Sequence, residues 1–145
     1  MKVLRMVGGL AVGFVCAAGI LRPAFTALEA VWPEYAAAVP DKEYTLPMLG
    51  SRLSIAALLT IASSGAATLV AADRRVAWML GTLFVLVSLP SHLHYSLADY
   101  PVWYHAVYLL SLVPIAWLGG KLVPDRLCSI PRAAPAAQQA VGADV

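Results

Sequence analysis

Four long apolar segments are the feature of this 145-residue chain that most limits how it can fold. They cover residues 4–21, 53–72, 76–91 and 102–123. A helix needs roughly 20 apolar residues to cross the hydrocarbon of a bilayer, and each segment approaches that length. Backbone groups in lipid must bond within their own segment, so helices are expected. The sequence therefore predicts an all-α membrane protein built as a four-transmembrane-helix bundle.

The composition indicates lipid rather than water as the surroundings of most side chains. Hydrophobic residues make up 61% of the chain and charged residues 12%, against usual shares of about 45–50% and about 25%. The net charge is +2 and no basic run occurs, so no nucleic acid is predicted as a partner. Cys16 and Cys128 lie far apart and form no C-x-x-C pair, which argues against a disulfide framework or a thiol redox centre.

The positions of lysine and arginine predict the orientation of the four segments. Basic residues precede the first segment, fill the turn between the second and third, and follow the fourth; the turn between the third and fourth has none. We therefore expect a protein of the cytoplasmic (inner) membrane with both termini in the cytoplasm. The alternative for the first segment is a cleaved signal peptide, although no clear small-x-small cleavage site follows it.

The first loop contains a predicted helix over about residues 24–38. Pro23 suits the first turn of such a helix, and apolar residues recur at three- and four-residue steps after it. Trp32 and Tyr35 are typical of a membrane interface, so this helix is expected to lie on the extracytoplasmic surface of the bundle. Residues 39–50 are expected to be irregular. Residues 124–145, dominated by alanine, proline and glutamine, are expected to form a disordered cytoplasmic tail.

Small residues predict how the helices pack. Gly9, Gly13 and Ala17 form a stripe along the first segment, and a second stripe follows the second segment: Ala56, Thr60, Ser64, Thr68 and Ala72. We expect the two stripes to face each other. The hydroxyls of the second stripe serve as packing contacts in one interpretation and line a polar pathway in the other. No Asp, Glu, Lys or His lies in the middle of a predicted segment, which argues against a proton-coupled exporter, channel or pump.

All three histidines of the chain lie within residues 88–105. His92, His94 and His105, with Asp99, are candidate ligands of a transition metal, because imidazole suits zinc, copper, nickel and iron and a carboxylate adds an oxygen. A haem, a quinone or a lipid headgroup is the second interpretation of the stretch. The neighbouring tyrosines and tryptophan put it at the membrane interface.

Joint chelation by His92 and His94 requires Pro90 to end the third helix, because residues two apart on a helix point to different sides. The third interpretation is a polar turn without a ligand. In that turn Asp99 caps the fourth helix, Pro101 occupies its first turn, and the histidines bond free carbonyls of the third helix.

Three functions follow from these observations. The first is a structural or accessory membrane subunit that contacts the lipid bilayer and another membrane protein or a second copy of itself. The second is a membrane protein that binds a metal or redox cofactor through the histidine stretch. The third is an interfacial enzyme in which His105 is the acid or base and Asp99 orients it. No catalytic residue is predicted from a motif, because the chain has no nucleophile constellation and no phosphate-binding glycine loop.

Overall fold

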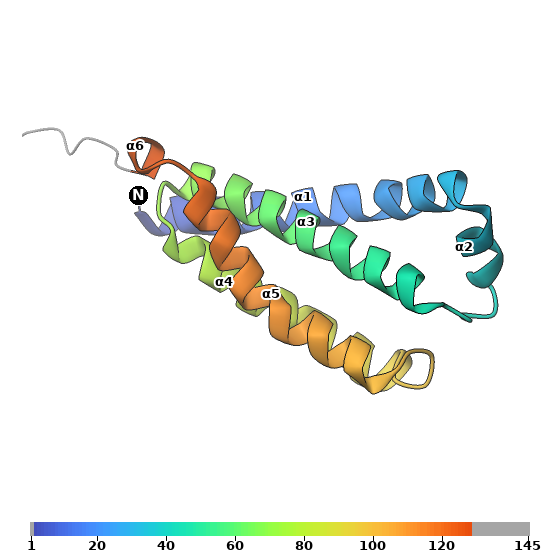
Figure 1. The fold of residues 1–145 in the computed structure, drawn as a ribbon. Coiled ribbons are helices and arrows are strands. Elements are labelled where there is room, and N and C mark those ends of the chain that lie inside the picture. Colours follow the sequence, from blue (N-terminus) through green and yellow to red (C-terminus); the bar gives the residue numbers. More distant parts are fainter. Residues whose placement is uncertain (1, 129–145) are drawn as a thin grey trace, which may run out of the picture.

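The computed structural model describes residues 2–128 and is helical in that range apart from short connections (Figure 1). Its elements follow one another as α1 (Lys2–Val31), α2 (Pro33–Ala38), α3 (Leu46–Ala71), α4 (Arg75–Pro90), the π-helical turn η1 (Ser91–Tyr95), α5 (Val102–Leu122) and α6 (Asp125–Cys128). Within the described residues, four helical stretches are long and apolar enough to span a membrane: Lys2–Val31, Leu46–Ala71, Arg75–His94 and Val102–Leu122. The predicted all-helical class, with four helices long and apolar enough to span a membrane, is confirmed for the described residues.

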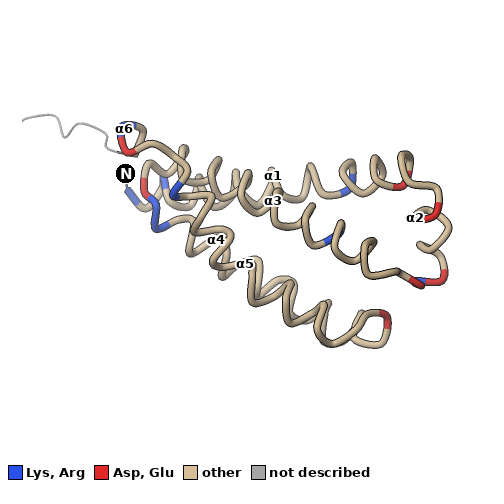
Figure 2. The backbone as a smooth tube through the Cα atoms, in the orientation of Figure 1, with Lys and Arg blue, Asp and Glu red and all other residues tan. Residues whose placement is uncertain are grey.

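The helices form two pairs that diverge along the molecule. Figure 1 shows α1 beside α3, and α4 beside α5. The pairs lie close together at the end that carries the N-terminus and α6, here called the narrow end. They separate toward the end that carries α2 and η1, here called the wide end. Charged residues gather toward the two ends, whereas the central turns of α4 and α5 carry none (Figure 2).

The first helix is longer than the sequence predicted. α1 continues through Pro23, so the division into a span at 4–21 and a loop helix at 24–38 is wrong. Proline removes one backbone hydrogen bond, and membrane helices tolerate that loss. The chain leaves the helix instead at Trp32, with φ −133° and ψ 88°, because the ring of Pro33 pushes the preceding residue toward extended conformations. α2 is the remainder of the predicted loop helix.

The second membrane helix begins earlier than predicted. α3 starts at Leu46 rather than at residue 53, within a segment expected to be irregular. Thr45 precedes it in an extended conformation (φ −73°, ψ 165°), and Pro47 occupies the first turn, where its fixed φ and missing N–H suit a helix start. Arg52 therefore lies inside a helix that could span a membrane and not in front of one.

The third helix persists beyond Pro90. α4 passes directly into η1, so helical backbone runs to Tyr95 instead of ending at residue 91. The condition for joint chelation by His92 and His94 is therefore not met, because their positions point to different sides of a helical backbone. Of the predicted tail 124–145, the first residues form α6, and residues 129–145 lie outside the described part of the chain.

Glycines bring the helices together in the half nearer the narrow end. A Cβ added at Gly9 would lie 2.7 Å from the carbonyl oxygen of Ala67, and one at Gly81 would lie 2.9 Å from Cβ of Ala116. Such distances mean that backbones approach closely, which is how helices gain packing energy in lipid. At the same end Arg74 donates to the carbonyl oxygen of Val123 at 2.7 Å.

The two predicted stripes do not face each other. Gly13 of α1 packs against Ser63 and Ala67 of α3, whereas Ser64 of α3 packs against Gly119 of α5. Helix α3 carries small residues on two sides, so the sequence pattern alone did not distinguish which side meets α1.

The hydroxyls of the α3 stripe bond back to their own helix. Thr60 donates to the carbonyl oxygen of Ala56 at 2.7 Å, Ser64 to that of Thr60 at 2.7 Å, and Thr68 to that of Ser64 at 2.8 Å. Each donor is thus satisfied without a partner from another helix. This arrangement favours packing over a polar pathway as the role of the stripe.

Gly119→Ala is expected to reduce the free energy of unfolding by about 1–3 kcal/mol, the usual cost of overpacking. The added Cβ would meet Ser64 Oγ and lie 2.5 Å from the carbonyl oxygen of Ile61. Gly19→Ala is the matched control, because nothing lies within 4 Å of a Cβ there. Thermal unfolding in detergent, followed by circular dichroism, compares the two. Equal stability of both variants would contradict the close contact of α5 with α3.

Candidate functional site

Arg52 belongs to α3, lies at the wide end and interacts with Tyr104 of α5. Aromatic rings surround its guanidinium. Nη1 of Arg52 donates to the hydroxyl of Tyr35 at 2.5 Å and to that of Tyr44 at 3.5 Å. The guanidinium carbon lies 4.8 Å from the ring centroid of Phe25, 4.9 Å from that of Tyr44 and 5.4 Å from that of Tyr100. Rings at these distances attract a cation through their negative faces. These residues, together with Tyr104, which also interacts with the guanidinium, are called the Arg52 cluster.

Arg52 keeps a positive charge that no carboxylate neutralises. Within residues 2–128, the ion pairs join other residues and none involves Arg52. Its Nε is buried and has no hydrogen-bond partner. A charge withdrawn from water is costly unless it is paired and hydrogen-bonded, and tyrosine hydroxyls with ring faces offset only part of that cost.

Tyr100 and Tyr35 do not supply a negative charge to the cluster. Burial raises the pKa of Tyr100 to about 12, although Arg52 opposes the shift. Burial likewise raises the pKa of Tyr35 against the opposing effect of the same arginine. Both phenols are therefore neutral near pH 7, and the cation of the cluster stays uncompensated.

Two of the three histidines meet beside the cluster. Nδ1 of His92, in η1, lies 2.8 Å from Nδ1 of His105, in α5. At this distance one nitrogen donates and the other accepts, so the two rings cannot both be imidazolium. His105 is 3% exposed, and its Nε2 has no hydrogen-bond partner. The ring of His92 also stacks on Tyr108, with the centroids 4.4 Å apart.

The predicted ligand set is brought together only in part. Asp99 pairs with Nζ of Lys42 at 2.5 Å, so it neither joins His92 nor orients His105. It does not cap α5 either, because the residue before that helix is Pro101 and no side chain caps it. His94 is exposed. No group of three or more His, Cys, Asp or Glu side chains within residues 2–128 is arranged to hold a metal, and the four-residue site stays a prediction.

One cavity adjoins the Arg52 cluster, and a second cavity shares part of its lining. The outer cavity has a volume of about 170 Å³. Its polar wall comes from Arg52, His92, Ser96 and Tyr104. Phe25 contributes an apolar wall from α1. The outer cavity therefore offers N–H and O–H donors next to an unneutralised cation.

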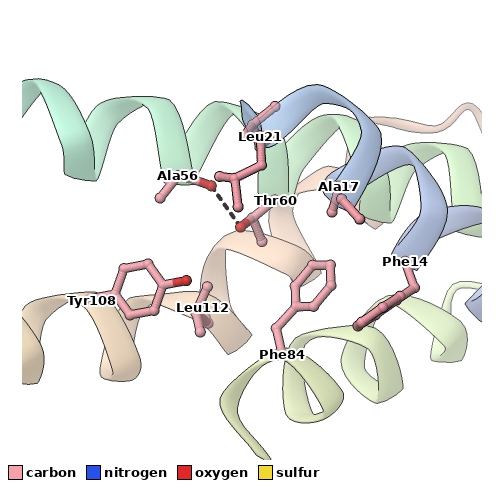
Figure 3. Close-up of a pocket in the computed structure, with 10 residues that line it drawn as sticks. Phe14, Ala17, Leu21, Ala56, Thr60, Phe84, Tyr108 and Leu112 are labelled. Carbon is pink, nitrogen blue, oxygen red and sulfur yellow. Dashed lines mark hydrogen bonds between the residues drawn. The ribbon is translucent and has the colours of Figure 1, made fainter. Parts of the chain in front are cut away.

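The inner cavity lies deeper between the two helix pairs and is apolar. It also measures about 170 Å³, and Phe14, Leu59 and Phe84 are among the residues that line it (Figure 3). Figure 3 shows side chains of α1, α3, α4 and α5 converging on it. The lining shared by the two cavities consists of Leu21, Ala56 and Tyr108. The cavities are therefore adjacent, one polar and one apolar.

Sequence reasoning missed Arg52 and the tyrosines of α5. The signals that could have found them are a single cation inside an apolar run that starts at Leu46, and the four-residue spacing of Tyr100, Tyr104 and Tyr108. Tyr104 and Tyr108 therefore lie on one face of α5, and Tyr100 lies just before that helix. The tyrosines were instead interpreted as markers of the membrane interface.

Fold and site together define an all-helical protein with four helices that can span a membrane and a polar, aromatic site at their wide end. No protein-family model, no curated protein and no solved structure matches this chain.

Tyr100→Phe is expected to remove a step near pH 12 from the alkaline titration of the folded protein. The ordinary pKa of tyrosine is about 10. The folded state therefore holds this proton more tightly than the unfolded state does. Its contribution to stability is complete below about pH 10 and is lost as the pH rises through 12. The ultraviolet absorbance of tyrosinate measures the titration; identical curves for variant and wild type above pH 11 or so would contradict the burial of this phenol.

Proposed function

We propose that this chain is a four-helix-bundle integral membrane protein of the cytoplasmic (inner) membrane, acting as a structural or accessory subunit without a catalytic centre of its own. The observation that carries this proposal is the apolar outer surface of the helices. Leu4 is 75% exposed, Leu58 66%, Trp78 49% and Leu110 78%, and they belong to four different helices. Lipid covers such a surface on all sides, whereas water would leave it as a large exposed apolar patch.

Both termini are proposed to be cytoplasmic. Basic residues prevail at the narrow end (Figure 2): Lys2, Arg5, Arg74, Arg75 and Lys121. Acidic residues prevail at the wide end, among them Glu29, Glu34 and Asp41. Cytoplasmic ends of membrane proteins carry the excess of lysine and arginine. In this orientation α2 is an interfacial helix on the extracytoplasmic side.

An accessory role is supported by the way the polar groups of α3 are used. Its hydroxyls bond within the helix, so they contribute packing and do not form a route for ions. The proposed contacts of the protein are the lipid bilayer and either another membrane protein or a second copy of the chain. Small residues on helix surfaces allow such helix-to-helix contacts in lipid.

Cysteine labelling tests the proposed orientation. In a Cys16→Ser, Cys128→Ser background, Glu34→Cys is expected to react with a membrane-impermeant maleimide added to intact spheroplasts. In a Cys16→Ser background, the native Cys128 is expected to react only after the membrane is permeabilised. The inverse pattern would contradict the orientation. Release of the chain by alkaline carbonate would contradict an integral membrane protein.

The second candidate function is the binding of a transition metal or a haem-like redox cofactor at the wide end. The contact between His92 and His105 favours it, because it brings together two imidazoles, the kind of side chain that suits a transition metal. Further ligands would come from water or from a bound molecule.

Elemental analysis of tag-free, detergent-purified protein tests this second function. The comparison is with a variant that carries His92→Ala, His94→Ala and His105→Ala. If the cofactor function is correct, wild type contains stoichiometric zinc, copper or iron, and the variant loses it. His94→Ala alone is the control, and it should retain the metal because the 2.8 Å contact joins His92 to His105 and does not include His94. Absence of metal from wild type would exclude this second function.

A further inference from the structure

The positive charge of Arg52 is the feature of the cluster that points to a ligand. Its cation faces the outer cavity and has no carboxylate partner within residues 2–128. A guanidinium binds carboxylate and phosphate through paired, charge-assisted hydrogen bonds, which are stronger than hydrogen bonds between neutral groups. An anionic group in the outer cavity would neutralise this charge.

The other polar groups of the outer cavity also suit an anion. Ser96 and Tyr104 contribute hydroxyl groups to its lining, and His92 contributes an imidazole. Each of these side chains can donate a hydrogen bond. The lining residues include no aspartate or glutamate that would repel a negative charge.

The adjoining inner cavity suits the apolar body of the same molecule. Leu21, Ala56 and Tyr108 line both cavities, and the small side chain of Ala56 leaves room at the junction. Each cavity measures about 170 Å³. An apolar cavity of about 150 Å³ can hold a benzene-sized group. The pair therefore accommodates a head and at least the first part of a hydrocarbon body.

The position of the two cavities matches the way an amphiphile lies in a membrane. The polar cavity is at the wide end. Two tryptophans, a residue type typical of membrane interfaces, adjoin the Arg52 cluster there: Trp32 lies 6.0 Å from Tyr35 and Trp103 lies 6.2 Å from Tyr104 between ring centroids. The apolar cavity is nearer the middle of the helices, between side chains such as Phe14 and Phe84. A molecule with its head at the interface and its tail in the hydrocarbon would enter both without turning over.

We propose that the joined cavities bind a membrane-soluble amphiphile with an anionic carboxylate or phosphate head, which pairs with Arg52, and an apolar body that extends past Ala56 into the inner cavity. This ligand site goes beyond the accessory role proposed above and does not depend on it.

Equilibrium binding of dodecanoate, dodecyl phosphate and dodecanol to the purified full chain in nonionic detergent tests the proposal. At least one of the two anions is expected to bind in a one-to-one ratio, and dodecanol, which has the same chain without a charge, at least roughly tenfold more weakly. Arg52→Gln should weaken anion binding by roughly tenfold to a hundredfold. Arg22→Gln is the matched control, because it removes an exposed charge from α1 and should leave binding unchanged.

Ala56→Leu provides a second, independent variant in case Arg52→Gln does not fold. It keeps Arg52 and fills the junction of the cavities, so it should also weaken binding of the anion, whereas Leu58→Ala on the lipid-facing side should not. Tighter binding of dodecanoate would indicate a fatty-acid ligand, and tighter binding of dodecyl phosphate a phospholipid head. Binding of neither anion, equal binding of dodecanol, or unchanged binding by Ala56→Leu would overturn the proposal.

Discussion

Close contact between small residues at the narrow end is the constraint on which the rest of this structure depends. Lipid supplies no hydrophobic force between helices, so they must gain energy from direct packing. Gly13 lets α1 approach α3, and Gly119 lets α5 approach the other side of α3. Because the small residues are concentrated in that half, the two helix pairs meet there and diverge toward the wide end (Figure 1).

The wide end is held by different forces, and these forces create the candidate site. Lys42 and Asp99 join the two loops, and Arg52 with its tyrosines links α2 and α3 to α5. Bulky rings cannot fill the space between diverging helices as closely as glycine-mediated contacts do, so cavities remain beside them. The same arginine that links the segments is thus exposed to a cavity with its charge still unneutralised.

The number and nature of the membrane helices could be predicted from the sequence, whereas their ends could not. Hydrophobic runs are local properties of the chain, so all four spans were found. Two boundaries were wrong. Pro23 was interpreted as the start of a separate loop helix, whereas α1 continues through it. The second span was predicted to begin at residue 53, whereas α3 begins at Leu46 and includes Arg52. The histidine stretch was found, but only His92 and His105 meet.

The sequence by itself determined that the chain is helical, that four helices can cross a membrane and that polar aromatic residues cluster near one set of ends. These properties depend on side chains close together in the chain. Tertiary structure alone decided which face of α3 meets α1, that Asp99 pairs with Lys42, and that Arg52 lines a cavity. Those outcomes depend on contacts between residues far apart in the chain, where several pairings fit one pattern and packing energy selects among them.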